Sequence, residues 1–195
     1  MADQKHSVLF WSGGKDAFLA LRHISEPGAR ITLLTTCNED TGVVPHQDIP
    51  VEVIKMQARH LNLELLDVPL PDPCPNSIYL ERLQAVLSAL QPRPDLVFGD
   101  LRLAEIRTWR ESVFSGMGYS CHFPIWNKPY DKLLEILWAQ PVEVYISSVA
   151  EAFRGELSPG SRYDKAFVEN LPAHIDPMGE NGEFHTVVRF LPPEP

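Results

Sequence analysis

The sequence predicts an α/β fold with a mostly parallel sheet. Short apolar runs rich in β-branched residues alternate with stretches whose apolar residues recur at helical spacing. The chain has 195 residues, of which 44% are hydrophobic and 22% charged. This length and composition suit one folded domain with a sizeable core, and they argue against a disordered, collagen-like or coiled-coil chain.

The first elements form a strand–helix–strand unit. Residues 7–11 are an apolar run, and residues 15–24 repeat apolar side chains at the helical interval. Pro27 and Gly28 end that helix, and residues 30–37 form the second strand.

The middle of the chain continues the alternation. A polar stretch, 38–50, leads into a predicted helix whose apolar positions Val51, Ile54, Ala58 and Leu61 keep the helical interval, and a third strand follows at 63–68. Residues 69–75 contain four prolines, which lack the N–H donor that a sheet interior or a helix needs, so we expect a loop there. Beyond it the same patterns predict helices at 77–90, 103–117 and 133–139 and strands at 96–99, 121–125, 142–149 and 186–191.

Charge and cysteine usage exclude several function classes. Lys and Arg number 17 and Asp and Glu 26, so the formal net charge is 17 − 26 = −9, and no run of basic residues is longer than a pair. DNA binding is therefore disfavoured. Cys37, Cys74 and Cys121 show neither a disulfide framework nor the spacing of a zinc site. The first residues resemble neither a signal peptide nor a membrane span, so we expect a cytoplasmic protein.

The strongest motif is Ser12-Gly13-Gly14-Lys15-Asp16, between the first strand and the first helix. Glycines let the backbone approach a ligand, and the N–H groups at a helix start attract an anion, so this loop predicts a phosphate site. The alternative is a plain strand-to-helix turn with a solvated lysine. The spacing matches neither GxxxxGK[ST] nor GxGxxG, which excludes a Walker-type kinase and a Rossmann dehydrogenase.

These five residues resemble the PP-loop of the N-type ATP pyrophosphatases. An ordered set of further motifs resembles the diphthine-ammonia ligase family and its short bacterial-type relatives: His46, Met56-Gln57-Ala58, Phe98-Gly99-Asp100, residues 106–111 (IRTWRE), residues 123–126 (FPIW) and residues 176–186, which include GENGEFHT.

The resemblance implies a three-layer α/β/α sandwich with a Rossmann-like parallel sheet of the PP-loop type. Residues 1–150 would form the ATP-binding domain, and residues 151–195 a C-terminal active-site segment packed on it. It further implies ATP and magnesium as cofactors, activation of a carboxylate as its adenylate with release of pyrophosphate, and transfer of ammonia to the activated carbonyl. In the namesake the acceptor is diphthine on elongation factor 2; here the acceptor stays open.

Candidate site residues follow from the motifs and the resemblance. The expected ATP-binding residues are Ser12, Gly13, Gly14, Lys15, Asp16, Thr35, Thr36 and Cys37, although the two threonines also suit a strand by propensity alone. Asp16 and Asp100 are the expected magnesium ligands, and Asp100 has an alternative as a helix cap.

Lys15, Asp100, Glu183 and His185 are the expected catalytic residues, with His185 as a proton acceptor or, alternatively, a structural hydrogen-bonding group. The expected substrate-binding residues are His46, Arg107, Arg110, Glu180, Asn181, Gly182 and Thr186. The two arginines, three positions apart on one helix, could hold a carboxylate or pyrophosphate, or form surface ion pairs with Glu105 or Glu111.

Three functions are compatible with these features. The first is an ATP-dependent amide-forming ligase whose partners are a small-molecule or protein-borne carboxylate and ammonia. The second is a non-catalytic adenine-nucleotide-binding module of the universal-stress-protein type. The third is a tRNA-modifying PP-loop enzyme, which the acidic charge balance and the absence of a cysteine pair disfavour. A homodimer is expected from general frequencies only.

Overall fold

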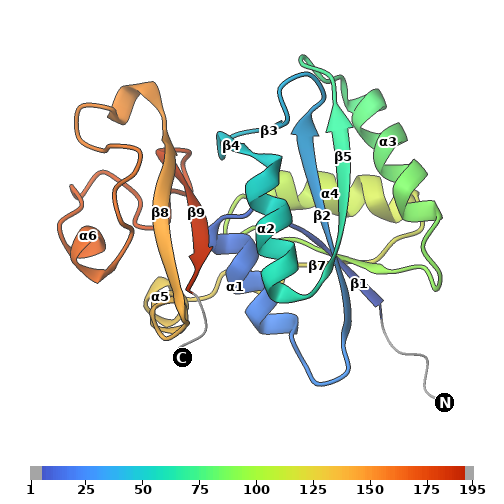
Figure 1. Cartoon of the computed structure of the whole chain (residues 1–195), viewed down its shortest axis with the longest axis horizontal. Coiled ribbons are helices and arrows are strands. Elements are labelled where there is room, and N and C mark those ends of the chain that lie inside the picture. Colours follow the sequence, from blue (N-terminus) through green and yellow to red (C-terminus); the bar gives the residue numbers. More distant parts are fainter. Residues whose placement is uncertain (1–5, 192–195) are drawn as a thin grey trace.

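A five-stranded parallel sheet forms the centre of the molecule (Figure 1). This computed structural model describes residues 6–191. The strand order is β5-β2-β1-β6-β7, and every neighbouring pair is parallel. In chain order the strands are β1 (His6–Phe10), β2 (Arg30–Asn38), β5 (Glu64–Leu70), β6 (Asp95–Val97) and β7 (Cys121–His122).

Helices cover both faces of this sheet because successive strand residues point to opposite sides. In β1, Val8 packs in a cluster with residues of α3 (Asn76–Ser88) and α4 (Ala104–Gly116). Its neighbour Leu9 packs in a second cluster with residues of α1 (Lys15–Ile24), α2 (Val51–Leu61) and α5 (Tyr130–Trp138). The predicted three-layer α/β/α fold is therefore confirmed. None of the helices within residues 6–191 is long and apolar enough to cross a membrane.

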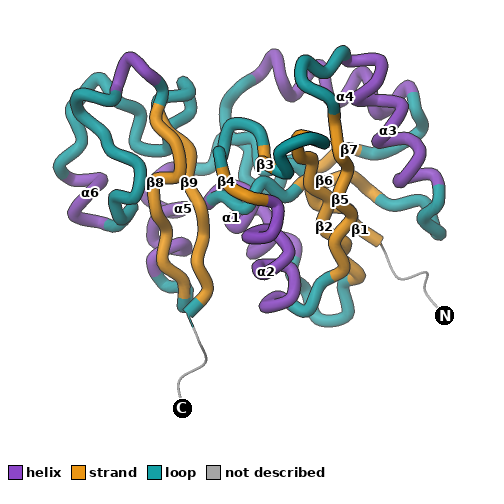
Figure 2. Tube along the Cα trace, turned by 45° about the horizontal axis from the view of Figure 1, so that its top comes forward, coloured by secondary structure: helices purple, strands orange, loops and turns teal. Residues whose placement is uncertain are grey.

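A second β-structure lies beyond α1 and α2. Strands β8 (Val142–Val149) and β9 (Phe184–Phe190) pair antiparallel in a ladder of their own, and β9 contacts α1 and α2 (Figures 1 and 2). The strand predicted at 142–149 is thus present, but outside the parallel sheet. The predicted domain boundary at residue 150 falls directly after β8. The antiparallel pair therefore combines a strand before this boundary, β8, with a strand after it, β9. The connection between the strands carries a 3₁₀ turn (Glu151–Phe153) and α6 (Lys165–Glu169).

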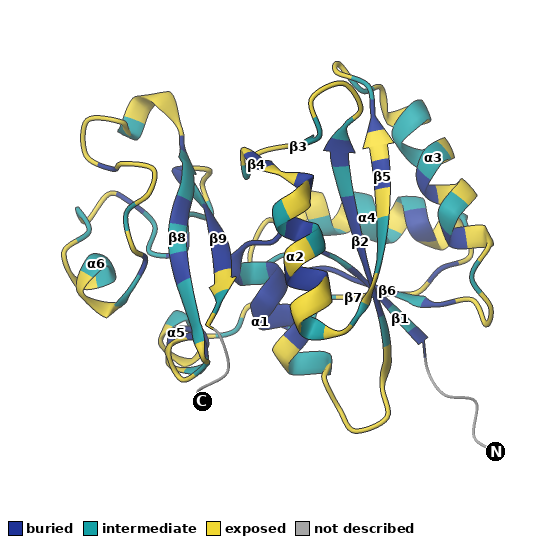
Figure 3. Ribbon diagram, viewed as in Figure 1, coloured by how far each residue is buried: buried dark blue, intermediate teal, exposed yellow. Residues whose placement is uncertain are grey.

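Helix α1 lies between the parallel sheet and β9, and it is therefore buried on almost all sides (Figure 3). Residues Ala17 to Leu21 are all buried, and so is Lys15 at the start of the helix. The stretch predicted as a polar loop before α2 contains a short antiparallel pair, β3 (Val43–Val44) and β4 (Ile49–Pro50). The turn of this pair carries His46.

Two sequence-based boundaries are wrong at the edges of the sheet. Strand β5 continues through Pro69 and Leu70, which were expected in a loop. Proline is tolerated there because β5 is an edge strand and its outer side needs no N–H donor. Strand β7 covers only Cys121 and His122 instead of residues 121–125.

The strand order places a ligand site at the carboxyl ends of β1 and β6. From β1 the chain fills one side of the sheet with β2 and β5, then crosses to the other side with β6 and β7. The connections leaving β1 and β6 therefore diverge on opposite faces and leave a crevice between them, which is where open α/β sheets bind ligands.

Candidate functional site

The turn Ser12–Gly13–Gly14 joins β1 to α1 at this crevice and requires glycine. Gly13 has a φ of 81°, and a Cβ there would lie 2.4 Å from Cδ1 of Ile54. A Cβ on Gly14 would lie 2.9 Å from the carbonyl oxygen of Thr186. The glycines therefore serve close packing on α2 and β9 as well as the conformation of the turn.

The first residues of α1 follow this turn directly, and their backbone N–H groups lie beside it. The N-cap of the helix, Gly14, offers no side chain, and the Lys15 N–H donates to Oγ1 of Thr186 at 3.0 Å. Gly99, directly after β6, lies so close to α1 that a Cβ would be 2.9 Å from the backbone of Asp16. The partial positive charge of this helix end thus faces the crevice between β1 and β6, as an anion site requires.

Gln57, a buried residue of α2, holds the turn from behind. Its Oε1 accepts a hydrogen bond from the Trp11 indole at 2.7 Å. Its Nε2 donates to the carbonyl oxygens of Gly13, at 3.0 Å, and Val188, at 2.7 Å. One neutral side chain therefore joins β1, the glycine turn and β9, a role that the sequence analysis missed.

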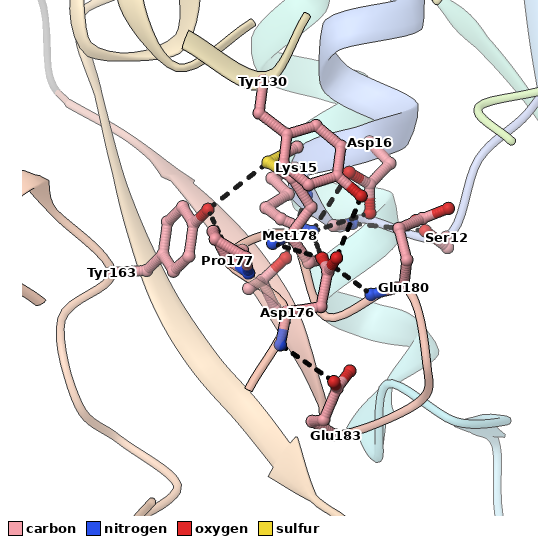
Figure 4. Close-up of polar contacts among 12 residues, drawn as sticks. Ser12, Lys15, Asp16, Tyr130, Tyr163, Asp176, Pro177, Met178, Glu180 and Glu183 are labelled. Atoms are coloured by element: carbon pink, nitrogen blue, oxygen red, sulfur yellow. Dashed lines mark hydrogen bonds and ion pairs between the residues drawn. The ribbon is translucent and has the colours of Figure 1, made fainter. Parts of the chain in front are cut away.

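Lys15 lies inside the molecule, with only 2% of the residue exposed. Its Nζ donates to both carboxylate oxygens of Asp16, at 3.0 and 2.9 Å, and to the carbonyl oxygen of Met178 (Figure 4). The rings of Tyr163 and Phe184 lie 5.8 Å from the same nitrogen. The cation expected to bind phosphate is thus held against the segment 176–183, which we call the C-terminal loop.

Three carboxylates gather around Lys15 (Figure 4). Asp176 accepts from the Tyr130 hydroxyl at 3.1 Å and from the Met178 N–H at 2.8 Å. Burial raises the pKa of Asp16, against the opposing effect of Lys15. Burial, together with the charge of Asp16, raises the pKa of Glu180 to about 7. Some of this negative charge is therefore neutralised by protons near neutral pH unless a cation enters the cleft.

Glu183 faces its own loop instead of the cleft. The residue is 1% exposed, and its oxygens accept from the N–H groups of Asp176, at 2.9 Å, and Asn181, at 3.0 Å. The Asn181 side chain adds a third bond at 3.0 Å. Burial alone would raise the pKa of Glu183, but these hydrogen bonds outweigh it and lower the pKa. The expected catalytic carboxylate is, by its contacts, the group that shapes the C-terminal loop.

Asp100 and Arg110 form an ion pair in the cleft wall. Arg110 Nε lies 2.9 Å from Asp100 Oδ2, and the guanidinium lies 4.5 Å from the centre of the Phe98 ring. Burial raises the pKa of Asp100, and Arg110 opposes this. Both predicted residues therefore reach the cleft.

Arg107 does not reach the cleft with Arg110. Its Nε lies 2.8 Å from Glu111 Oε1, and its guanidinium lies over the rings of Phe123 and Trp126, at 4.9 and 4.8 Å. Because three residues turn a helix by about 300°, the two arginines diverge enough to meet different aromatic rings. The alternative interpretation, an ion pair with Glu111, describes Arg107 better.

His46 and His185 meet on the opposite side of the cleft. Their ring centres are 5.8 Å apart, and both line the cleft. Burial, then the neighbouring His46 and Lys15, lower the pKa of His185 to about 4. His185 is consequently a neutral imidazole at physiological pH, with an unprotonated ring nitrogen but a lower basicity than an ordinary histidine.

These groups surround one cleft of about 760 Å³. Thr35 and Thr36, at the end of β2, line it, whereas Cys37 is buried in the core cluster and does not. Ser12, Lys15 and Asp16 line it from the N-terminal side, and Glu180, Asn181, Gly182, His185 and Thr186 from the C-terminal side. The fold therefore brings together segments about 170 residues apart.

A comparison with models of protein families assigns this chain to a family. The model of the diphthamide synthase N-terminal domain matches residues 5–120, which is more than half of the chain. The chain belongs to this family. The match contains the glycine turn, Asp100 and Arg110, and the C-terminal loop lies outside it.

Membership of the diphthamide synthase N-terminal domain family indicates an ATP-using, PP-loop type of enzyme domain. A comparison with curated proteins finds no match. Among solved structures, a predicted subunit of tRNA methyltransferase from Methanocaldococcus jannaschii is similar over 69% of this chain and 74% of that chain. The TM-score is 0.44 at 17% identity, so this likeness carries no functional argument.

The carboxylates of the cleft suit magnesium better than a metal whose ligands must all come from protein side chains. Within residues 6–191 no group of three or more His, Cys, Asp or Glu side chains is arranged to hold a metal. Asp16 and Asp100 both line the cleft, and the negative charge of Asp16 contributes to the raised pKa of Asp100 after the larger effect of burial. Magnesium commonly binds one or two carboxylates together with water and phosphate oxygens, so these two residues fit it.

Besides Gln57, the sequence analysis missed Asp176, Tyr130 and Tyr163. The Tyr163 hydroxyl donates to the Pro177 carbonyl at 2.8 Å, so both tyrosines hold the C-terminal loop beside Lys15. A signal existed for Asp176, which opens the DPMGENGE string. Nothing in the local sequence marks the tyrosines, because Tyr130 reaches the loop from the start of α5 and Tyr163 from the connection between β8 and β9.

Proposed function

We propose that this chain is an ATP-dependent, amide-forming ligase that adenylates a substrate carboxylate, releases pyrophosphate and transfers ammonia to the activated carbonyl. The single observation that supports this most is the joining of the glycine turn and the C-terminal loop in one cleft. The hydrogen bond from Lys15 Nζ to the carbonyl oxygen of Met178 ties the C-terminal loop to the residue that follows the glycine turn. A cleft of this kind suits both a triphosphate and an acceptor.

The phosphate end of the cleft would be preorganised. The backbone of Gly13 and Gly14 and the start of α1 supply N–H donors, and Lys15 supplies a cation that exchanges Asp16 and Met178 for a phosphate oxygen. Asp16 and Asp100 would hold magnesium, which supplies charge neutralisation for the departing pyrophosphate. Thr35 and Thr36 would meet the nucleoside part at the end of β2.

The acceptor would be held across the cleft, with Arg110 on one wall and His185 on the opposite wall. Arg110 presents a guanidinium to the cleft and can hold a carboxylate by paired hydrogen bonds. His185, neutral because of its low pKa, can take a proton from the ammonia nitrogen as the C–N bond forms and the bond to AMP breaks. His46 stands beside it and is one of the causes of this low pKa.

The test is the identity of the nucleotide products. ATP labelled at the α-phosphorus is incubated with the chain, magnesium, ammonium chloride and pooled carboxylic acids, and the products are separated by chromatography. We expect AMP and pyrophosphate in amounts that depend on a carboxylate. ADP and phosphate would contradict the proposal, and saturable ATP binding without turnover on any acid would favour the non-catalytic nucleotide-binding module.

A matched pair of lysine variants links the result to the cleft. Lys15→Met removes the buried cation, and Lys132→Met removes a lysine that is 62% exposed and pairs with Glu135 on the surface. ATP affinity, measured by calorimetry, should fall at least about tenfold in the first and stay unchanged in the second. Equal affinity in both variants would mean that ATP binds elsewhere.

A further inference from the structure

A second cavity, of about 250 Å³, lies between α3 and α4 beside the cleft. Tyr79 and Arg110 line both cavities, so the second one, which we call the side pocket, shares a wall with the cleft. The described residues that line the side pocket are Cys74, Asn76, Tyr79, Ile106, Trp109 and Arg110.

Flat apolar surfaces dominate this pocket. The rings of Tyr79 and Trp109 have centres 6.3 Å apart and are inclined by 40°, and Phe114 supports Trp109 edge-on at 6.4 Å. Ile106, at the rim, is 40% exposed. Two inclined aromatic faces and an aliphatic rim favour a flat ring, which gains offset or edge-to-face contacts with both.

One cationic group lines the side pocket, and its counter-ion lies on the cleft side of the shared wall. Among its six described lining residues Arg110 alone carries a formal charge. The carboxylate that pairs with Arg110, Asp100, lines the cleft and not the side pocket. A guanidinium has five N–H donors, more than one carboxylate uses, so Arg110 can hold a second carboxylate at the shared wall. The same charge disfavours a cationic body in the pocket.

We propose that the side pocket binds the body of the acceptor, and that the acceptor is a small carboxylic acid whose body is a flat, uncharged ring. Its carboxylate lies against Arg110 at the shared wall and faces the cleft, while its ring packs against the rings of Tyr79 and Trp109. This inference rests on the proposed ligase function for the fate of the carboxylate, but the binding itself requires no ATP.

The test is a ligand-observed NMR titration of the full chain without nucleotide, with three probes. Phenylacetate combines a ring with a carboxylate, phenylacetamide keeps the ring without the charge, and 4-(trimethylammonio)butyrate keeps the carboxylate on a cationic body. We expect phenylacetate to bind, phenylacetamide to bind about tenfold more weakly, and the third probe to bind more weakly still. Equal or tighter binding of 4-(trimethylammonio)butyrate, or no binding of phenylacetate, would overturn the proposal.

Two tryptophan variants locate the binding. Ile106→Trp fills the side pocket from its exposed rim and should weaken phenylacetate binding about tenfold or more. Ser112→Trp adds the same side chain at an exposed position of α4 that lines neither cavity, and it should leave the affinity unchanged. Circular dichroism establishes that both variants fold, and an equal effect of the two would place the ligand elsewhere.

The two proposals fail separately. If phenylacetate binds, Ile106→Trp abolishes this binding, and no acid leads to AMP formation, then the side-pocket proposal stands and the ligase proposal is wrong. AMP formation with only aliphatic or cationic carboxylates would keep the ligase and reject this acceptor class.

Discussion

The glycine turn and the C-terminal loop face each other across the cleft, but different forces hold them. The turn is shaped by neutral contacts: glycines packed against Ile54 and Thr186, and the amide of Gln57 behind them. The C-terminal loop is shaped by charge, because the Glu183 carboxylate binds its N–H groups. The conformation of the glycine turn should therefore be sensitive to shape and little affected by pH, whereas that of the C-terminal loop should depend on pH.

The largest expected effect comes from shape, in Gly13→Ala. The new Cβ would meet Ile54 and Gln57 at a φ of 81°, so we expect a loss of about 3 kcal/mol in the free energy of unfolding and of most ATP affinity. Urea denaturation and calorimetry measure the two. Gly182→Ala, with a φ of 83° but no atom within 4 Å, should cost only about 1 kcal/mol. Equal losses would show that backbone strain alone, and not packing, restricts the turn.

Removing the neutral support behind the turn should be the next largest effect. Gln57→Leu keeps the volume but leaves the Trp11 indole and the Gly13 and Val188 carbonyls without this partner, so we expect about 2 kcal/mol of destabilisation. The KM for ATP should rise about tenfold with a smaller change in kcat. Gln84→Leu, at an exposed position of α3, is the control. A change in kcat with an unaltered KM would contradict a positioning role at the phosphate end.

On the acidic side, Glu183→Gln should destabilise by about 1–2 kcal/mol at pH 7, because it replaces charge-assisted hydrogen bonds. The folded pKa of Glu183 lies below its ordinary value of 4.5. Its stabilising contribution is therefore present above that value and is lost as the pH falls through the folded pKa. The difference between wild type and variant, measured by urea denaturation, should shrink on acidification. A constant difference would mean that the charge of Glu183 contributes nothing.

The smallest effect should have the opposite sign, in Glu180→Gln. The folded pKa of Glu180 is raised to about 7, so its charged form destabilises the fold as the pH rises from 4.5 to 7. The variant should be more stable than wild type by about 1 kcal/mol or less at pH 8 and equally stable at pH 4.5. The amide oxygen can still accept from the Arg102 N–H. If the variant were less stable than wild type at pH 8, this would contradict the inference that repulsion among the carboxylates around Lys15 destabilises the fold.

Local patterns were sufficient for most of the fold. The helix predicted at 15–24 and the strand at 142–149 match α1 and β8 residue for residue, and the four apolar positions predicted to lie on the next helix all fall within α2, because apolar periodicity and the Pro and Gly breaks are local signals. The order of strands and helices followed from the same signals. The glycine turn could also be predicted, since its place between a strand and a helix and its glycines are features of consecutive residues.

The sequence by itself determined the α/β class, the helix and strand order and the glycine turn with Lys15 at its end. Only the tertiary structure decided that β8 leaves the parallel sheet to pair with β9, that Arg107 and Arg110 separate, and that Glu183 turns inward while Gln57 supports the turn. The physical reason is that secondary structure depends on neighbours a few residues away. The direction of a polar side chain depends instead on which distant donors and acceptors folding leaves buried beside it.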